Sequence, residues 1–274
     1  MLKQFTVLKY LLLVIAFAFG KYLHASDSTS LRPLHEMRMQ YKFMQVDKMG
    51  NLYVVSAGNQ LFKYASTFEK QSTLNYAFSG SIDAIDVSNP LEIYVFYKEL
   101  NQVLLLDNNL AYRGKINLTD WGITQAACIA RSYDNGIWVF DLGDFQLKKF
   151  DKKGTLLQSS GNFRQFNQSA SFAPIACIDD GNTVLLADSI SGIFQFDVFG
   201  NFVKKYQVSG VCAVQLLKES YLYLKDNELF EQAFLMPKKS ILQFKEPKIR
   251  FFNLQSTTII LGLPAQIKSF KYSN

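Results

Sequence analysis

The chain has 274 residues, of which 49% are hydrophobic, 15% aromatic and 19% charged, with a formal net charge of +6. This composition excludes a disordered or collagen-like chain. The length is sufficient to bury a core without disulfide or metal crosslinks. With 24 phenylalanines and 14 tyrosines against 6 prolines, the chain is expected to be built from strands rather than helices.

Residues 1–25 have the three-part layout of a secretory signal peptide. Lys3 and Lys9 form a positive start, an apolar run covers residues 11–19, and small residues near Ala25 offer a cleavage site. The alternative is an uncleaved membrane anchor, which needs about 20 apolar residues, whereas the uninterrupted apolar stretch covers only residues 10–20. The sequence therefore predicts export to a periplasm or to the cell exterior, and a mature chain of residues 26–274 without a transmembrane span.

Cleavage also changes the charge. Loss of Lys3, Lys9 and Lys21 leaves 29 − 3 = 26 basic residues against 23 acidic ones, so the mature net charge is +3. An excess this small does not indicate nucleic-acid binding. The basic residues that remain in excess lie late, in residues 236–274, and we interpret them as a mildly basic surface rather than a site for an anionic ligand.

The rest of the chain repeats. Six short segments rich in aromatic and aliphatic residues have anchors at Tyr53, Tyr94, Trp138, Leu185, Tyr223 and Ile260, separated by 207/5, or about 41, residues on average. Each anchor is preceded and followed by a strand-like run, and a fourth run closes several units. Four short strands in each unit, joined by Gly, Asn and Asp turns, predict an all-β, six-bladed β-propeller.

Closure of the ring requires one more strand. The sixth unit shows three strand-like runs, while residues 38–42 stand spare before the first unit. We expect an N-terminal strand, somewhere within residues 31–42, to complete the last blade and leave no open sheet edge. Residues 26–274 then form a single propeller domain, which is expected to be monomeric.

Three units resemble NHL repeats. Residues 185–202 contain a strand, Ala187-Asp188, a polar turn, a second strand that ends in Phe196-Asp197, and a turn with a glycine; residues 46–64 and 138–154 are similar. The resemblance implies a six-bladed propeller of the exported bacterial type. NHL-like propellers include binding scaffolds, hydrolases and lyases, so the resemblance implies no single activity.

Catalytic motifs are not apparent in the sequence. His35 is the one histidine of the mature chain, which excludes a multi-histidine zinc site and disfavours a Ser-His-Asp triad. Cys128, Cys177 and Cys212 occupy matching positions in the first strands of units three to five, and we interpret them as buried thiols rather than a redox or metal site. No cofactor is expected.

Several aspartates offer an alternative. Propeller hydrolases can hold a divalent ion at the channel mouth with oxygen ligands. The candidate acids here are Asp47, Asp83, Asp86, Asp179 and Asp180. They lie beside turn residues, so we interpret them as stabilising turns, and a hydrolase or lyase with a divalent-ion site stays the alternative function.

The predicted binding residues lie on loops that join the fourth strand of a unit to the first strand of the next, or the second strand to the third. These two kinds of loop share one face of a propeller, and the longest covers residues 159–173. The candidates are Tyr97, Lys98, Trp121, Asp144, Phe163, Arg164, Phe166 and Asp188. Aromatic and arginine side chains are enriched at interfaces, although loop aromatics such as Phe172 can also fold inward. The leading hypothesis is an exported, non-enzymatic scaffold that recognises a protein or glycan partner in the cell envelope through this face.

Overall fold

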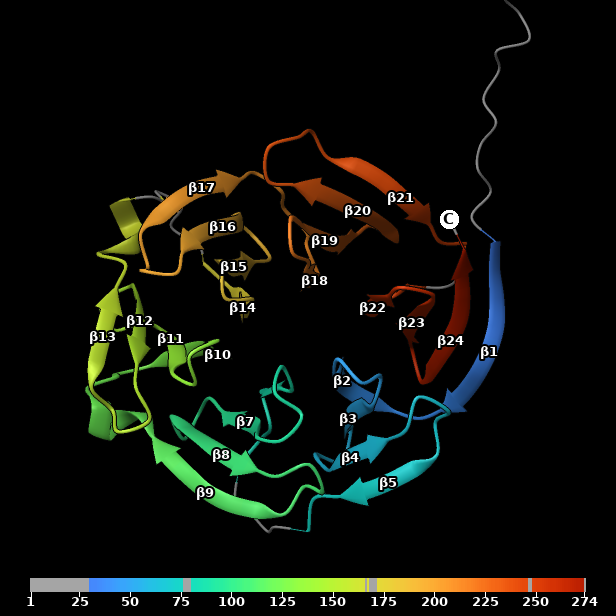
Figure 1. Cartoon of the computed structure of the whole chain (residues 1–274), viewed down its shortest axis with the longest axis horizontal. Helices are drawn as coiled ribbons and strands as arrows, with labels where there is room; N and C mark the ends of the chain where they lie inside the picture. Colours follow the sequence, from blue (N-terminus) through green and yellow to red (C-terminus); the bar gives the residue numbers. More distant parts are fainter. Residues whose placement is uncertain (1–29, 76–79, 166, 168–171, 246–247, 274) are drawn as a thin grey trace, which may run out of the picture.

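The computed structural model describes residues 30–75, 80–165, 167, 172–245 and 248–273. In these residues, six four-stranded antiparallel sheets stand around a central axis and form the predicted β-propeller (Figure 1). Blade 1 contains β2 (Tyr41–Val46), β3 (Leu52–Ser56), β4 (Leu61–Tyr64) and β5 (Lys70–Thr73); blade 2 contains β6 (Ala84–Asp86), β7 (Ile93–Tyr97), β8 (Gln102–Leu106) and β9 (Tyr112–Asn117); blade 3 contains β10 (Ala126–Arg131), β11 (Ile137–Asp141), β12 (Gln146–Phe150) and β13 (Leu156–Ser159). Blade 4 contains β14 (Pro174–Asp179), β15 (Thr183–Asp188), β16 (Gly192–Asp197) and β17 (Phe202–Tyr206); blade 5 contains β18 (Ala213–Leu216), β19 (Ser220–Lys225), β20 (Glu228–Ala233) and β21 (Lys239–Gln243); blade 6 contains β22 (Phe251–Gln255), β23 (Thr258–Leu263), β24 (Gln266–Ser273) and β1 (Ser30–Arg38).

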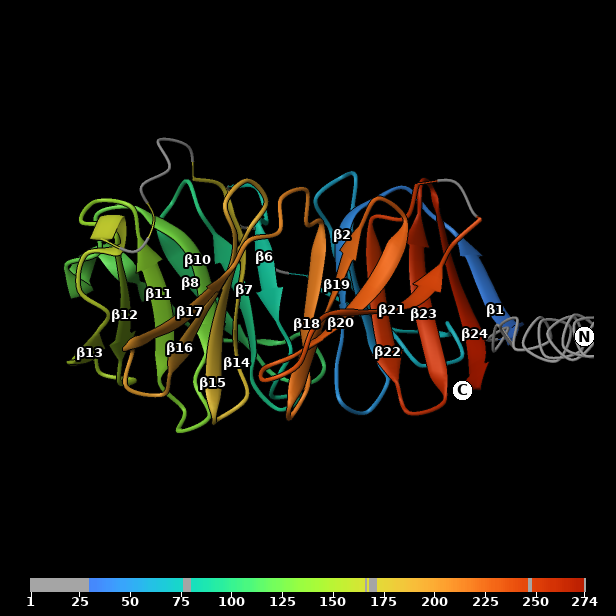
Figure 2. The ribbon, with the colours of Figure 1, turned by 90° about the horizontal axis from the view of Figure 1, so that it is seen from above.

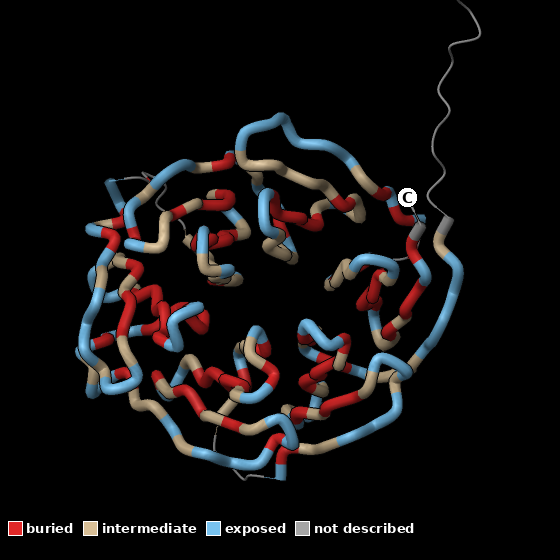
Figure 3. The backbone as a smooth tube through the Cα atoms, in the orientation of Figure 1, coloured by how far each residue is buried: buried red, intermediate tan, exposed pale blue. Residues whose placement is uncertain are grey.

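The central residues of the second strand of each blade are apolar, and both sides of that strand are buried. In β3, Tyr53 and Val55 pack toward blade 2, whereas Leu52 and Val54 pack toward blade 6. The core accordingly consists of six clusters, each shared by two neighbouring blades. Figure 3 shows that the outer rim of the ring is mostly exposed, whereas buried residues lie on the strands inside it. The anchors of the sequence repeat are residues of these second strands.

Ring closure by an N-terminal strand is confirmed. The outermost strand of blade 6 is β1, which pairs antiparallel with β24 and places Ser30 opposite Ser273 and Arg38 opposite Gln266. The prediction that the spare segment at residues 38–42 forms the closing strand is wrong, because Tyr41 and Lys42 belong to β2. An outermost strand covers the core from one side only, and most of β1 is exposed, so its sequence lacks the apolar pattern that reveals the inner strands.

The ring has two faces, seen from the side in Figure 2. Because the strands within each blade alternate in direction, the loops between blades and the turns between second and third strands lie on one face, which we call the connector face. The turns between first and second strands and between third and fourth strands lie on the other, which we call the turn face. Along β14 and β10, the inner strands of blades 4 and 3 approach each other more closely than other neighbouring inner strands do.

Candidate ligand-binding face

Three turns on the turn face are closed by the same pattern of hydrogen bonds to an aspartate side chain. In residues 47–51, 151–155 and 197–201, the Oδ1 of the leading aspartate accepts hydrogen bonds of 2.8–2.9 Å from the amides two and four positions later. The fourth residue is a glycine at φ between 83° and 87°, a left-handed conformation that glycine adopts most readily. The hydrogen bond from the Thr155 amide lowers the pKa of Asp151, and the amide and charge of Lys153 lower it further. These turns therefore hold their central residues in fixed positions.

An axial cavity of about 590 Å³ is lined by the inner strands of all six blades. Ile85, Ile129 and Val214 contribute apolar walls. At the turn-face end, the lining is polar and combines Asp47, Lys48, Asp86, Asp179, Asp180, Gln215, Asn253 and Gln255. We call this end of the cavity the mouth. Its hydrogen-bonding groups come from blades 1, 2, 4, 5 and 6, so it is assembled only when the ring closes.

The aspartates of the mouth stabilise turns and neighbouring blades. Asp179 accepts hydrogen bonds from Gly181 N at 2.6 Å, and from Ser132 Oγ and Trp138 Nε1 of blade 3 at 2.8 and 2.9 Å. Asp180 uses Oδ1 for the amides of Asn182 and Thr183, both at 2.9 Å. The interpretation of these residues as turn stabilisers is confirmed.

No ion pair compensates the charge of the mouth. Among the described residues, no Lys or Arg side-chain nitrogen lies within 4 Å of a carboxylate oxygen of Asp47, Asp86, Asp179 or Asp180. In the same part of the chain, no three His, Cys, Asp or Glu side chains converge in a way that could hold a metal ion. Asp83 lies at the opposite end of blade 2, where its Oδ2 accepts the Lys98 amide at 2.8 Å. The mouth therefore has a negative potential that attracts a cation, although its carboxylates are not arranged as metal ligands.

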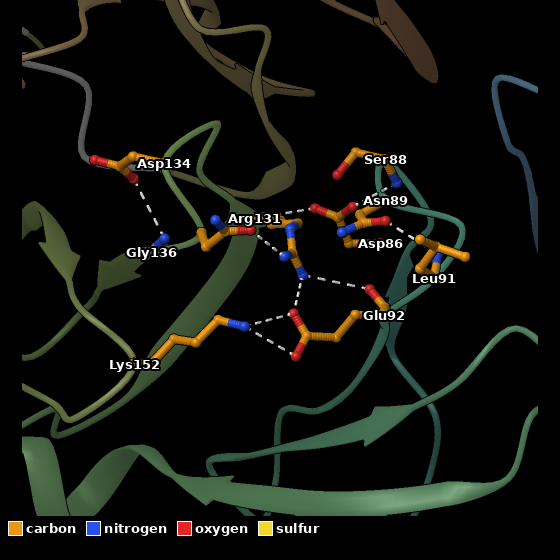
Figure 4. Close-up of polar contacts among 10 residues, drawn as sticks. Asp86, Ser88, Asn89, Leu91, Glu92, Arg131, Asp134, Gly136 and Lys152 are labelled. Carbon is orange, nitrogen blue, oxygen red and sulfur yellow. Dashed lines mark hydrogen bonds and ion pairs between the residues drawn. The ribbon is translucent and has the colours of Figure 1, made fainter.

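A charged network attaches the first turn of blade 2 to blade 3 beside the mouth (Figure 4). The buried Arg131 guanidinium pairs with Glu92 and donates to Asn135 Oδ1 at 2.6 Å, while the Arg131 amide donates to Asp86 Oδ2 at 2.7 Å. Lys152 Nζ lies 3.0 Å from Glu92 Oε2. Partial burial raises the pKa of Glu92, but the hydrogen bonds and charges of Arg131 and Lys152 outweigh burial and hold that pKa below its usual value.

Large apolar side chains project from the turn face. The group, which we call the apolar tips, is 59–96% exposed and comprises Met49, Leu91, Tyr133, Phe199, Leu235 and Met236, from the turns of blades 1 to 5. In the described loops of the connector face, the exposed large apolar residues are Leu100 and Ile190, and each side chain is less than half exposed. Sequence reasoning missed the apolar tips. The available signal was an apolar residue inside a turn, as in Asp47-Lys-Met-Gly-Asn51, where a polar residue is usual.

Three of the predicted binding residues are buried in the connector face. Tyr97 belongs to the cluster between blades 1 and 2. Phe163, in the short 3-10 helix η2 (Phe163–Gln165), packs 4.5 Å from Phe194 and 5.3 Å from Phe140 between ring centroids. Asp188 accepts hydrogen bonds from the amides of Ala173, Ile190 and Ser191, and so closes its own turn. In this conformation, the three side chains hold loops in place.

The other predicted residues are more accessible but are not assembled into one patch. Arg164 stacks on Phe145, with its guanidinium carbon 4.3 Å from the ring centroid, and Asp144 pairs with Lys148 at 2.5 Å in the adjacent turn. Lys98 lines a separate cavity of about 370 Å³ between blades 2 and 3. Trp121, in the 3-10 helix η1 (Leu118–Trp121), packs on Phe150 between the same blades. Phe166 lies outside the described residues, as does the predicted signal peptide at residues 1–25.

The cysteines are not equivalent. Cys128 and Cys177 are buried in the cluster shared by blades 3 and 4, and burial raises the pKa of Cys128 to about 12. Cys212 is exposed, and its Sγ donates to the Leu224 carbonyl oxygen at 3.3 Å. The expectation of three buried thiols is therefore wrong for Cys212, which precedes β18 instead of lying within the strand.

Comparisons with known proteins identify the fold. No protein-family model and no curated protein matches this sequence. Among solved structures, a streptogramin B lyase is similar with a TM-score of 0.61 and 12% identity, over 84% of this chain and 78% of that chain. A catalytically inactive histidine-to-alanine variant of virginiamycin B lyase from Staphylococcus aureus, solved with quinupristin, is similar with a TM-score of 0.60 and 11% identity, over 83% and 79%. At this identity the likeness establishes the propeller, and the NHL resemblance stays a prediction. Within the described residues, no helix has the length and hydrophobicity needed to span a membrane.

Proposed function

We propose that this protein is an exported, non-enzymatic binding scaffold whose protein or glycan partner, in the cell envelope, contacts the turn face. The observation that carries the proposal is that the apolar tips and the polar mouth of the axial cavity lie on the same face. Exposed apolar side chains gathered on one face are typical of interaction sites. The hydrogen-bonded turns at Met49 and Phe199 reduce the conformational entropy lost on binding, since the backbone of these turns is already held in place.

The alternative function is a propeller lyase or hydrolase, and the likeness to two streptogramin lyases favours it. One of those enzymes is described as inactive after replacement of a histidine by alanine. The described part of this chain has a single histidine, His35, in the outermost strand of blade 6, where its ring lies 5.9 Å from that of Phe68. A histidine in that strand is far from the cavity, so among the described residues no histidine at the mouth could take the part of the one replaced in that lyase. Incubation with quinupristin should leave the mass and retention time of that compound unchanged, as followed by liquid chromatography and mass spectrometry.

Photo-crosslinking in the cell of origin tests the binding face. A photoreactive phenylalanine analogue replaces Leu91 on the turn face or, as a matched control, Ile190 on the connector face; both residues are exposed turn residues. The proposal expects a defined adduct from position 91 and none from position 190. An adduct from position 190 alone, or from neither position, would contradict it, and turnover of quinupristin would favour the lyase.

A further inference from the structure

We propose that the partner is a protein that presents a lysine or arginine side chain surrounded by apolar residues, and that this basic side chain enters the mouth while its apolar neighbours pack on the apolar tips. This inference rests on the proposed function and specifies the chemistry of its partner. Two independent features carry it, the apolar tips of the turn face and the uncompensated charge of the mouth on the same face.

Backbone hydrogen bonds or a ring contact hold four of the six apolar tips in place. Met49 and Phe199 lie inside the aspartate-closed turns at residues 47–51 and 197–201, where their own amides donate to the aspartate Oδ1. The Leu91 amide donates to Asn89 Oδ1 at 3.0 Å. Tyr133 lies under the buried Lys149, whose Nζ is 4.9 Å from the ring centroid. Methionine and aromatic side chains are enriched at protein interfaces, and side chains on fixed turns suit a structured protein surface.

The charge of the mouth selects the central group of the partner. Four aspartates line it against Lys48, and none has a basic partner in the described chain. Asp180 is the exposed member, and because it uses Oδ1 for both of its turn bonds, its Oδ2 can accept a hydrogen bond from a guanidinium or ammonium group. Such charge-assisted bonds are stronger than neutral ones. A cation enclosed by apolar contacts is also shielded from competing water.

An anionic lipid surface fits this face less well. The exposed acids Glu69, Asp134, Asp180 and Glu219 lie on the same face as Lys48, Lys152 and Lys218, and Lys152 is already paired with Glu92. An anionic bilayer would bring its phosphates toward the uncompensated aspartates of the mouth, which is repulsive. The mixed charges and the acidic centre favour a protein with a basic projection.

The test uses a phage-displayed library of random peptides. The target is the chain from Ser26, because residues 30–273 hold all the strands of the closed ring. Selection on this protein is followed by removal of phage that also bind the variant Met49→Ser/Leu91→Ser/Phe199→Ser, whose substitutions are at exposed positions. We expect enrichment of peptides with one Arg or Lys flanked by apolar residues. Their affinity should fall at least about tenfold on the triple variant and on Asp180→Lys, and stay unchanged on the connector-face control Ile190→Ser.

Other outcomes overturn the inference. Failure to enrich any peptide, enrichment of acidic or neutral peptides, or equal binding by a peptide whose Arg is replaced by citrulline would each do so. Co-sedimentation of the wild-type protein with phosphatidylglycerol vesicles, lost in the triple variant, would show a lipid-binding face instead. An adduct at position 91 that resists protease but not glycosidases would show a glycan. If position 91 still gives an adduct while the peptides are neutral, the binding face is correct and only the partner chemistry is wrong. Melting curves of each variant verify folding.

Discussion

The connector face and the turn face are built from the same repeats, yet their side chains have different tasks. On the connector face, Asn59, Asn101 and Asn227 each adopt a left-handed conformation, and each Oδ1 accepts an amide of the next blade at 2.7–2.9 Å. On the turn face, aspartates close turns and leave apolar residues exposed. Side chains in the loops that join blades must supply hydrogen bonds to buried backbone groups between the blades. The turns within a blade are closed by their own aspartates, so their exposed side chains are available for binding.

Removal of the closing strand should have the largest effect, because both faces depend on the closed ring. A chain that starts at Met39 lacks β1 and exposes the edge of β24 and the cluster between blades 6 and 5. We expect aggregation or a fall in melting temperature of more than about 10 °C, measured by calorimetry and light scattering. A chain that starts at Ser30 is the control and should keep the full melting temperature. A monomeric Met39 chain with an unchanged transition would contradict the closed ring.

The second prediction concerns the charged network beneath the turn face. Replacement of Arg131 by Met removes a buried cation and leaves the Glu92 carboxylate with Lys152 alone. Breaking a buried ion pair at one partner should lower the free energy of unfolding by about 3 kcal/mol, measured by urea denaturation. Arg113→Met is the matched control, because the Arg113 side chain is mostly exposed where it pairs with Asp107, and it should cost less than about 1 kcal/mol. Equal losses in the two variants would show that the network adds nothing beyond an exposed pair.

The third prediction breaks the connector face. Asn101 donates to the Ile123 carbonyl oxygen at 2.8 Å and accepts from the Ala126 amide at 2.9 Å while at φ 52°. Asn101→Ala should cost about 2 kcal/mol, since two buried backbone groups lose their partners. Asn101→Gly separates the causes, because glycine tolerates the left-handed backbone but makes neither bond. If the glycine variant is as stable as the wild type, the cost is one of backbone conformation. Peptide binding at the turn face should be unaffected.

The smallest effect concerns the thiols, whose reactivity can be read without altering the fold. At pH 8, a thiol reagent should label Cys212 in the native protein and label Cys128 and Cys177 only after denaturation, because burial raises the pKa of both and restricts access. Peptide mapping by mass spectrometry identifies the labelled site. Rapid native labelling of Cys128 or Cys177 would show that blades 3 and 4 separate readily.

Much of the fold could be predicted from local patterns in the chain. Strands buried on both sides are apolar at their centres, so Tyr53, Trp138 and the other anchors showed the number of blades and their period. Turns closed by an aspartate and a glycine were also readable, since their hydrogen bonds connect residues within five positions. The likeness to solved propellers agrees with this reading.

Tertiary structure decided the positions that depend on distant neighbours. β1 is mostly exposed and carries no apolar period, so only its pairing with β24 identifies the closing strand. Phe163 and Met49 are both apolar residues of loops or turns. Phe163 is buried because Phe140 and Phe194 from two blades form a pocket for it, whereas no blade covers Met49. The hydrophobic effect depends on the area removed from water, and which loop residue loses that area is settled by packing between blades rather than by its own sequence.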